Sequence, residues 1–320
     1  MQAGAKRLEE LKRFHSLSLY FRKRYGLRVH KISLDAGFTC PNRDGQRGRG
    51  GCIYCDEFGS GSGAYFRGQS LKDQVLQSLE QLSRRFKAQR FMVYFQSFSN
   101  TYGPIKKLKG LYDSVLLDDR IIGLSVGTRP DCVDEAVVDL LASYRQRGLE
   151  VWLELGLQSI HEVTLRRINR GHGVAEFYRA LDLAKKAGLL VCVHVIFGLP
   201  GEDYQMMLET IEALSQAPID GLKFHALYVL KKTPLETLYR RGEYHPLSLG
   251  EYVDLVAEAL SLLPWSVVIQ RLSSDPPRDR LVAPEWTLKK NLILSAIETT
   301  LVSRDLWQGK RRGEKWPRKI

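Results

Sequence analysis

Short apolar runs alternate with longer amphipathic stretches along the 320 residues of the chain. The apolar runs are rich in Val, Ile and aromatic residues, which is typical of buried or half-buried β-strands. They lie at residues 29–34, 91–96, 121–126, 150–155, 190–196 and 221–228. The stretches between them have helical periodicity, so the pattern predicts successive β–α units.

Three of the predicted helices have recognisable boundaries. One begins after Ser70, which is a candidate N-cap because Asp73 follows three residues later. A second runs through residues 174–187 and ends at the glycine that follows, and a third covers residues 204–215.

Six β–α units in sequence imply a parallel sheet with helical crossovers. Six units are too few to close an eight-stranded barrel, so we predict an α/β fold with a partial (βα)6 TIM-like barrel at residues 29–263. A basic N-terminal helical segment (residues 1–28) precedes it, and a basic C-terminal extension (residues 264–320) follows it. Ligands of such sheets gather at the carboxyl ends of the strands, so residues there are candidate site residues.

Charge adds a candidate partner. The formal net charge is +12; residues 6–31 hold nine Lys/Arg and two Glu, and residues 304–319 hold seven Lys/Arg and two acidic residues. Basic ends, with Trp307 and Trp316 in the second of them, favour a nucleic acid, through phosphate contacts and base stacking. A solubilising surface explains the same charge, and composition leaves both interpretations open.

The sequence also indicates the cellular compartment. It has neither an apolar run of the length that a membrane helix needs nor an apolar signal core near the N-terminus. We therefore expect a cytoplasmic protein that does not associate with membranes. Its five cysteines are not a disulfide framework and indicate metal ligands, reactive thiols or core residues.

Three cysteines lie in the loop after the first predicted strand, CPNRDGQRGRGGCIYC. Eleven residues separate Cys40 from Cys52, and two separate Cys52 from Cys55. A Cys-x-x-Cys pair with a third cysteine on a glycine-rich arm indicates a metal site with three thiolate ligands. The spacing leaves zinc and iron–sulfur open, with a redox Cys-x-x-Cys as a further alternative. Cys132 and Cys192 are isolated, so we expect buried thiols there and no second cluster.

A three-cysteine loop after the first strand of a six-unit barrel resembles the radical S-adenosylmethionine (SAM) superfamily. The long first gap resembles the branch that contains the catalytic subunit of Elongator. A bacterial family of small radical enzymes, the YhcC/YtqA-like family, is resembled more closely, over roughly residues 29–285. The motifs that carry this resemblance are HKISLDAGFTCPNRDG, GGCIYC, GTRPD, ELGLQS, INRGH, IFGLPGE and KFHALYVLKKTPL.

The resemblance implies a [4Fe–4S] cluster held by Cys40, Cys52 and Cys55, with its fourth iron chelated by the methionine moiety of SAM. It implies cleavage of SAM to a 5′-deoxyadenosyl radical that abstracts a hydrogen atom from the substrate. An electron donor such as flavodoxin or ferredoxin is then an expected partner.

The expected cofactor contacts lie at strand ends: Gln96, Ser97, Asn100, Thr128, Arg129, Glu154, Gln158, Ile196 and Gly198. Residues 96–100 resemble the methionine-binding turn of the superfamily, although an Asn/Ser-rich helix cap has the same composition. Arg129 offers a fork for a carboxylate, and Pro130 after it is also an ordinary helix start. Glu154 lies in an apolar strand and needs a partner, either the cofactor or a buried ion pair with Arg129.

Lys223 and His225 alternate along the sixth predicted strand and are the candidate catalytic residues. The family that the chain resembles includes an enzyme that converts 5-carboxymethylaminomethyluridine, at the tRNA wobble position, to the 5-aminomethyl form. This resemblance and the basic ends favour tRNA as the partner. A radical enzyme acting on a small metabolite and a non-catalytic, zinc-stabilised RNA-binding protein are the alternatives.

Overall fold

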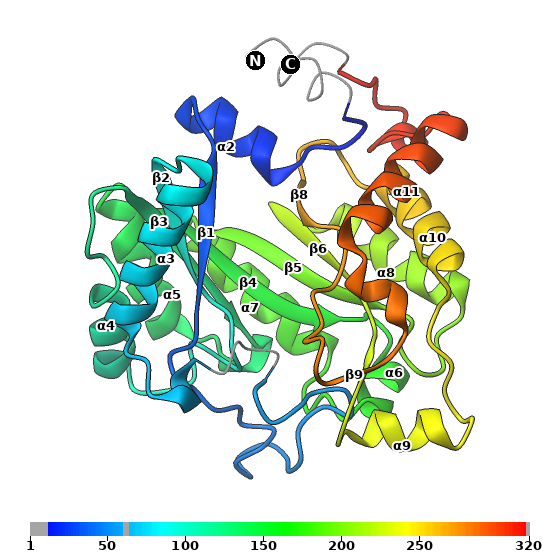
Figure 1. The fold of residues 1–320 in the computed structure, drawn as a ribbon, viewed down its shortest axis with the longest axis horizontal. Helices are drawn as coiled ribbons and strands as arrows, with labels where there is room; N and C mark the ends of the chain where they lie inside the picture. The colour runs from blue at the N-terminus through cyan, green and yellow to red at the C-terminus, as the bar shows by residue number, and fades with distance from the viewer. Residues whose placement is uncertain (1–11, 60–63, 318–320) are drawn as a thin grey trace. The chain divides into compact units, whose positions relative to one another are not determined.

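The computed structural model describes residues 12–59 and 64–317, which form two compact units (Figure 1). Of the described residues, 21–59, 64–157 and 169–193 belong to the N-terminal unit, and 12–20, 158–168 and 194–317 belong to the C-terminal unit. The first eleven residues of the predicted N-terminal segment and the last three of the predicted extension lie outside the described residues.

Parallel strands form the core of the N-terminal unit. β1 (Val29–Leu34), β2 (Arg90–Phe95), β3 (Ile121–Thr128) and β4 (Glu150–Gln158) pair in sequence order, and β5 (Leu190–Phe197) begins in this unit. The register pairs the last residue of β1 with the last residue of β2. The carboxyl ends of these strands therefore lie at one edge, where the loops after them meet.

Helices connect the strands of this unit: α3 (Leu71–Phe86), α4 (Ile105–Asp113), α5 (Glu135–Gln146) and α7 (Val174–Lys186). α3 packs against β1, and α5 packs against both α4 and α7 (Figure 1). The hydroxyl of Ser70 accepts a hydrogen bond from the Asp73 N–H at 3.1 Å, and Asp134 caps α5 through the Val137 N–H at 2.9 Å. These caps set the first residues of both helices.

The C-terminal unit contains the end of β5, followed by β6 (Gly221–Ala226) and β8 (Val268–Arg271), which pair in parallel. Its helices are α6 (Glu162–Arg167), α8 (Tyr204–Gln216), α9 (Pro234–Arg240), α10 (Leu249–Leu262) and α11 (Lys290–Ser303). α10 packs between α8 and α11 (Figure 1). β7 (Val229–Leu230) and β9 (Leu281–Ala283) form a separate antiparallel pair, and α2 (Leu17–Tyr25) precedes β1.

The strand order is β1-β2-β3-β4-β5-β6-β8, so β1 and β8 are the edges of an open sheet. The predicted class, an α/β fold built from βα units around an incomplete barrel sheet, is confirmed. All six predicted strands are present, but β8 is a seventh that the sequence pattern did not predict. Half of its four residues, VIQR, are polar, so its apolar run is too short to be recognised. No helix in the described parts of the chain is long and apolar enough to cross a membrane.

Candidate metal and cofactor site

The loop after β1 holds the three predicted metal ligands in a compact conformation. The carbonyl oxygen of Cys40 accepts hydrogen bonds from the N–H groups of Arg43 (2.8 Å) and Asp44 (3.2 Å). The Cys55 N–H donates to the Cys52 carbonyl oxygen at 2.9 Å, which brings the two ends of the Cys-x-x-Cys pair into one turn. All three cysteines are free thiols, with Cys52 buried and the other two half-buried.

Segment 169–172, which follows α6, holds this loop in place through hydrogen bonds. The Asn42 side-chain N–H₂ donates to the Asn169 carbonyl oxygen at 2.6 Å, and the Asn169 side chain donates to the Gly51 carbonyl oxygen at 2.7 Å. Asn169 has a φ of 53°, a left-handed conformation that asparagine tolerates better than most residues. Gly171 has a φ of 72°, and a Cβ there would lie 2.5 Å from the Asn42 amide oxygen. Only glycine allows this close approach.

Arg170 of this segment reaches one cysteine ligand directly. Its Nη1 lies 3.5 Å from the Cys52 sulfur, and its Nη2 donates to the Gly156 carbonyl oxygen at 2.7 Å. Burial alone would raise the pKa of the Cys52 thiol, but the charges of Arg170 and Arg129, with hydrogen bonds from Arg170 and Tyr54, together outweigh burial and lower it. Burial raises the pKa of Cys55 to about 12, because the nearby Arg43 compensates only in part. The two cysteines of one short motif thus lie in different electrostatic surroundings.

The turn after β2 carries buried oxygen atoms without a protein partner. The Ser97 hydroxyl and the Asn100 Oδ1 are buried, and neither has a hydrogen-bond partner among the described residues. The Asn100 side-chain N–H₂ donates to the Gly127 carbonyl oxygen at 2.8 Å, which fixes the direction of its Oδ1. Gln96 is half-buried, and its N–H donates to the Leu34 carbonyl oxygen at 3.3 Å. Buried unpartnered acceptors are costly unless a ligand supplies donors, such as an ammonium group.

The guanidinium group of Arg129, which the sequence suggested could bind a carboxylate of the cofactor, is already engaged within the protein. Its Nε and Nη2 donate to the two carboxylate oxygens of Asp131 at 2.8 and 2.9 Å, and its Nη1 donates to the Arg170 carbonyl oxygen at 2.7 Å. The Thr128 hydroxyl lies 2.7 Å from that of Thr101. Arg129 therefore supports segment 169–172, and its predicted contact with the cofactor stays a prediction.

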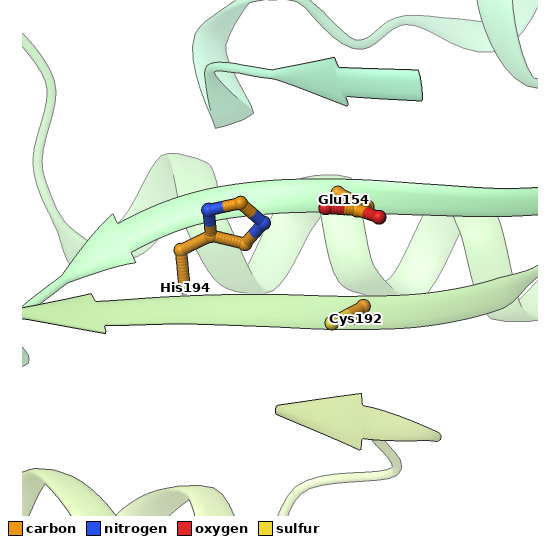
Figure 2. A group of neighbouring side chains, drawn as sticks. All are labelled: Glu154, Cys192 and His194. Carbon is orange, nitrogen blue, oxygen red and sulfur yellow. The ribbon is translucent and has the colours of Figure 1, made fainter. Parts of the chain in front are cut away.

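Glu154 finds a partner other than Arg129, so the predicted rival ion pair between these two residues is wrong. Its Oε1 accepts hydrogen bonds from Lys31 Nζ of β1, at 2.9 Å, and from the Ser125 hydroxyl of β3. Figure 2 shows Glu154 on β4, and Cys192 and His194 at alternate positions of β5. One carboxylate oxygen of Glu154 lies within 4.8 Å of the Cys192 sulfur. The carboxylate thus has a structural role within the sheet, and its predicted contact with SAM is untested.

The remaining predicted site residues belong to the C-terminal unit. Gly198, at the end of β5, has both backbone groups engaged: its N–H contacts the Met207 sulfur at 3.1 Å, and its carbonyl accepts from the Tyr244 hydroxyl at 3.0 Å. The carbonyl oxygen can accept a second hydrogen bond, so the predicted adenine contact by this glycine stays a prediction. Gln158 has a φ of 79°, and Ile196 is half-buried.

The two predicted catalytic residues lie on β6, as expected. Lys223 is buried, and His225 is half-buried with its ring centroid 5.2 Å from that of His194. The two rings are inclined by 30°. Their predicted roles in catalysis remain predictions.

The aromatic residues of the basic C-terminal segment (residues 304–316) are engaged within their own unit. Lys310 lies over the Trp307 ring at 4.6 Å, and Arg13 lies over the Trp316 ring at the same distance. The Trp307 indole N–H donates to the Glu314 carbonyl oxygen at 2.9 Å. These contacts give the rings a structural role, and the prediction that they stack on bases stays a prediction.

Comparison with known proteins identifies the architecture. The model of the radical SAM superfamily matches residues 42–214, and the model of the radical SAM C-terminal domain matches residues 219–303. The chain belongs to the radical SAM superfamily. This assignment confirms the resemblance seen in the sequence and makes the protein a radical SAM enzyme, whose family cofactors are a [4Fe–4S] cluster and SAM.

The chain is similar to YtqA over nearly its whole length, and to an enzyme named for tRNA uridine 34 over about half of it. It is 39% identical to YtqA of Bacillus subtilis over 299 residues, which cover 93% of this chain and 92% of YtqA. It is 30% identical to a tRNA uridine(34) acetyltransferase of Methanocaldococcus jannaschii over 179 residues, 55% of this chain and 32% of that protein. The solved structure of Methanocaldococcus infernus Elp3 has a TM-score of 0.69 at 19% identity. That match covers 88% of this chain but 64% of the longer Elp3 chain, and it shows the shared fold.

Sequence reasoning missed Asn42, Arg170 and His172. INRGH was noticed only as part of the family resemblance. The signal that was available is its composition: an arginine and a histidine flank a glycine in a short connection between two helices. Polar residues in a connection normally face water, so nothing in the local pattern indicated that this arginine is buried.

Proposed function

We propose that Cys40, Cys52 and Cys55 hold the [4Fe–4S] cluster of this radical SAM enzyme, and that its substrate is a tRNA wobble uridine. The proposed conversion is that of a 5-carboxymethylaminomethyl group to a 5-aminomethyl group. Hydrogen abstraction from the methylene beside the carboxylate, loss of a second electron to a one-electron acceptor and hydrolysis of the resulting imine would release the carboxymethyl group as glyoxylate and leave the amine.

The residues of the N-terminal unit fit both cofactors. Three free thiols in one loop, one of them hydrogen-bonded by a buried arginine, are suited to an anionic iron–sulfur cluster. The unpartnered oxygens of Ser97 and Asn100 are suited to the ammonium group of the SAM methionine moiety. When bound, the cluster supplies the electron that cleaves SAM and generates the radical. The protein positions the substrate and shields the reactive centre from water.

Similarity to an enzyme named for tRNA uridine 34 carries the substrate proposal. The cluster loop adds support from the structure, since it exposes two arginines next to the cysteines. Arg49 is exposed. The side chain of Arg47 is 53% exposed, and its Nε lies 3.9 Å from a carboxylate oxygen of Asp131. Cations at this position are suited to the phosphates of an RNA whose base is splayed out of its stack.

The test is a single-turnover reaction with reconstituted enzyme, a reductant, SAM and tRNA that carries 5-carboxymethylaminomethyluridine. Mass spectrometry of digested nucleosides is expected to show the 5-aminomethyl form, together with release of 5′-deoxyadenosine. The same tRNA without the modification, and the Cys52→Ala protein, are the matched controls. Release of 5′-deoxyadenosine with an unchanged nucleoside profile would reject the tRNA substrate and favour a small-metabolite substrate. The radical chemistry would stand in that case. An electron donor such as flavodoxin or ferredoxin is a further prediction for this reaction.

A further inference from the structure

Arg170 is a buried cation without a carboxylate partner among the described residues. Only 7% of its surface is exposed. Its side chain donates hydrogen bonds to the Gly156 carbonyl oxygen and the Cys52 sulfur, and its Nε is buried without a partner among the described residues. Asp131, whose carboxylate also feels the charge of Arg170, binds Arg129 through both of its carboxylate oxygens. A buried guanidinium needs an anion nearby, so the sulfur of Cys52 is its electrostatic partner.

The position of Arg170 is fixed from several sides. Its carbonyl oxygen accepts from Arg129 Nη1 at 2.7 Å, and its Nη2 is held by β4 through Gly156. Asn42 completes the arrangement, because its amide nitrogen lies 3.9 Å from the same sulfur and 2.6 Å from the Asn169 carbonyl oxygen. The guanidinium is therefore directed at Cys52 by the packing of its neighbours, and the contact does not depend on a mobile side chain.

We propose that Arg170 is a positioning residue that acts through Cys52 and raises the reduction potential of the cluster. The inference rests on the proposed assignment of Cys40, Cys52 and Cys55 as ligands. Reduction adds one negative charge to the cluster, and a fixed cation at one of its sulfurs stabilises the reduced state more than the oxidised state. Hydrogen bonds to ligand sulfurs act in the same direction. Arg170 thereby eases the entry of the electron that SAM cleavage requires.

The asymmetry between the ligands supports this inference. Arg43, whose charge acts on Cys55, donates to the Cys55 carbonyl oxygen at 2.8 Å and, among the described residues, makes no hydrogen bond to the Cys55 sulfur. Arg170, by contrast, donates to the sulfur itself. The chain thus directs one cation at one ligand sulfur, and it does so from a segment that is 118 residues away in sequence.

The test compares cluster potentials in proteins with equal iron content. Wild type, Arg170→Met and Arg170→Lys are reconstituted anaerobically, and the midpoint potential is measured by titration followed by electron paramagnetic resonance. We expect a more negative midpoint in Arg170→Met and a value near that of wild type in Arg170→Lys, which keeps the charge. Arg120→Met is the matched control, since Arg120 lies in the same unit and pairs with Asp118 through two bonds.

Asn42→Asp gives an independent test if Arg170→Met does not fold. It places a carboxylate next to the Cys52 sulfur with nearly unchanged shape, and we expect a more negative midpoint there also. An unshifted midpoint in Arg170→Met at wild-type iron content would overturn the proposal and leave the cluster assignment intact. An unshifted midpoint in Asn42→Asp would equally contradict it. Full iron content in Cys52→Ala would overturn the ligand assignment and this inference with it.

Discussion

Arg170 in the N-terminal unit and Arg311 in the C-terminal unit carry the same charge in opposite surroundings. Arg170 is buried, and its closest anionic group is the sulfur of Cys52 at 3.5 Å. Arg311 is half-exposed and pairs with the carboxylate of Glu258 at 2.5 Å. Its neighbours in the basic C-terminal segment are paired in the same way: Arg304 with Asp254, Lys310 with Asp305, and Arg312 with Glu314.

Arg170 is a charge directed at a functional site, whereas Arg311 and its neighbours are charges of surface ion pairs. Water screens the surface pairs, so each contributes little to stability, and they also offset part of the positive charge that the sequence shows in this segment. The buried arginine cannot be screened, so it strongly favours an anion at Cys52. The positive charge is most concentrated in the sequence at the two ends of the chain, but the buried cation that contacts a candidate ligand lies in segment 169–172.

The largest expected effect is removal of a cluster ligand. Cys52→Ala is expected to lose the cluster and all formation of 5′-deoxyadenosine, because two thiolates do not hold three irons. Iron and sulfide analysis after anaerobic reconstitution measures this, with about four irons per chain expected for wild type. Cys132→Ala is the matched control. Cys132 lies outside the cluster loop, so this variant should keep the iron content of wild type. Equal iron loss in both variants would contradict the assignment.

A buried charge pair gives the next largest effect. Lys31→Met removes the ammonium group that donates to Glu154 at 2.9 Å; the Glu154 side chain is fully buried, while that of Lys31 is 18% exposed. We expect the free energy of unfolding to fall by about 3 kcal/mol, as is typical when one partner of a buried pair is removed. Urea denaturation measures the change. The double variant Lys31→Met/Glu154→Gln should recover most of it, and no recovery would show that the charge of Glu154 is not the cause.

The buried histidine of segment 169–172 predicts a pH dependence. Burial and the charges of Arg170 and Arg129, opposed by Asp131, lower the pKa of His172 to about 3. An unfolded histidine titrates near a pKa of about 6.5, so the unfolded chain binds an extra proton below that pH and stability falls as the pH decreases toward 3. Between pH 6.5 and 5.5 this contributes about 1 kcal/mol.

His172→Asn should flatten the stability curve by that amount over this interval, as measured by denaturation at each pH. His245→Asn, which changes an exposed histidine, is the control. A slope in His172→Asn as steep as that of wild type would show that His172 does not carry this linkage.

A surface pair should show the smallest effect. Arg311→Met is expected to lower the free energy of unfolding by no more than about 0.5 kcal/mol, because the pair with Glu258 is partly exposed and screened. Thermal unfolding at low and high salt measures it. A loss as large as that of Lys31→Met would remove the distinction between the buried and the surface charges.

Much of the fold was predictable because its signals are local. β1 begins and ends at the predicted residues, and α3 begins directly after Ser70, since alternation and capping depend on neighbours only a few residues apart. β8 was missed because four residues with two polar positions carry no readable alternation. Its place in the sheet comes from pairing with β6, a partner more than forty residues earlier in the chain.

The candidate site divides in the same way. The cysteine spacing, the loop after β1 and the polar turn after β2 are properties of contiguous sequence, and they led to the superfamily that the comparisons confirm. The partners of the buried charges are not contiguous. Lys31 meets Glu154 across 123 residues, whereas the alternative pair of Glu154 with Arg129 is not formed, because Arg129 binds Asp131.

The sequence by itself determined the six longer strands of the sheet, the N-cap at Ser70 and the three thiols, since hydrophobic periodicity, capping and ligand spacing are encoded within short segments. Only the tertiary structure decided which cation reaches which anion. That choice depends on strand register and on the packing of segments far apart in the chain, and a buried charge stabilises the fold only next to the partner that this packing provides.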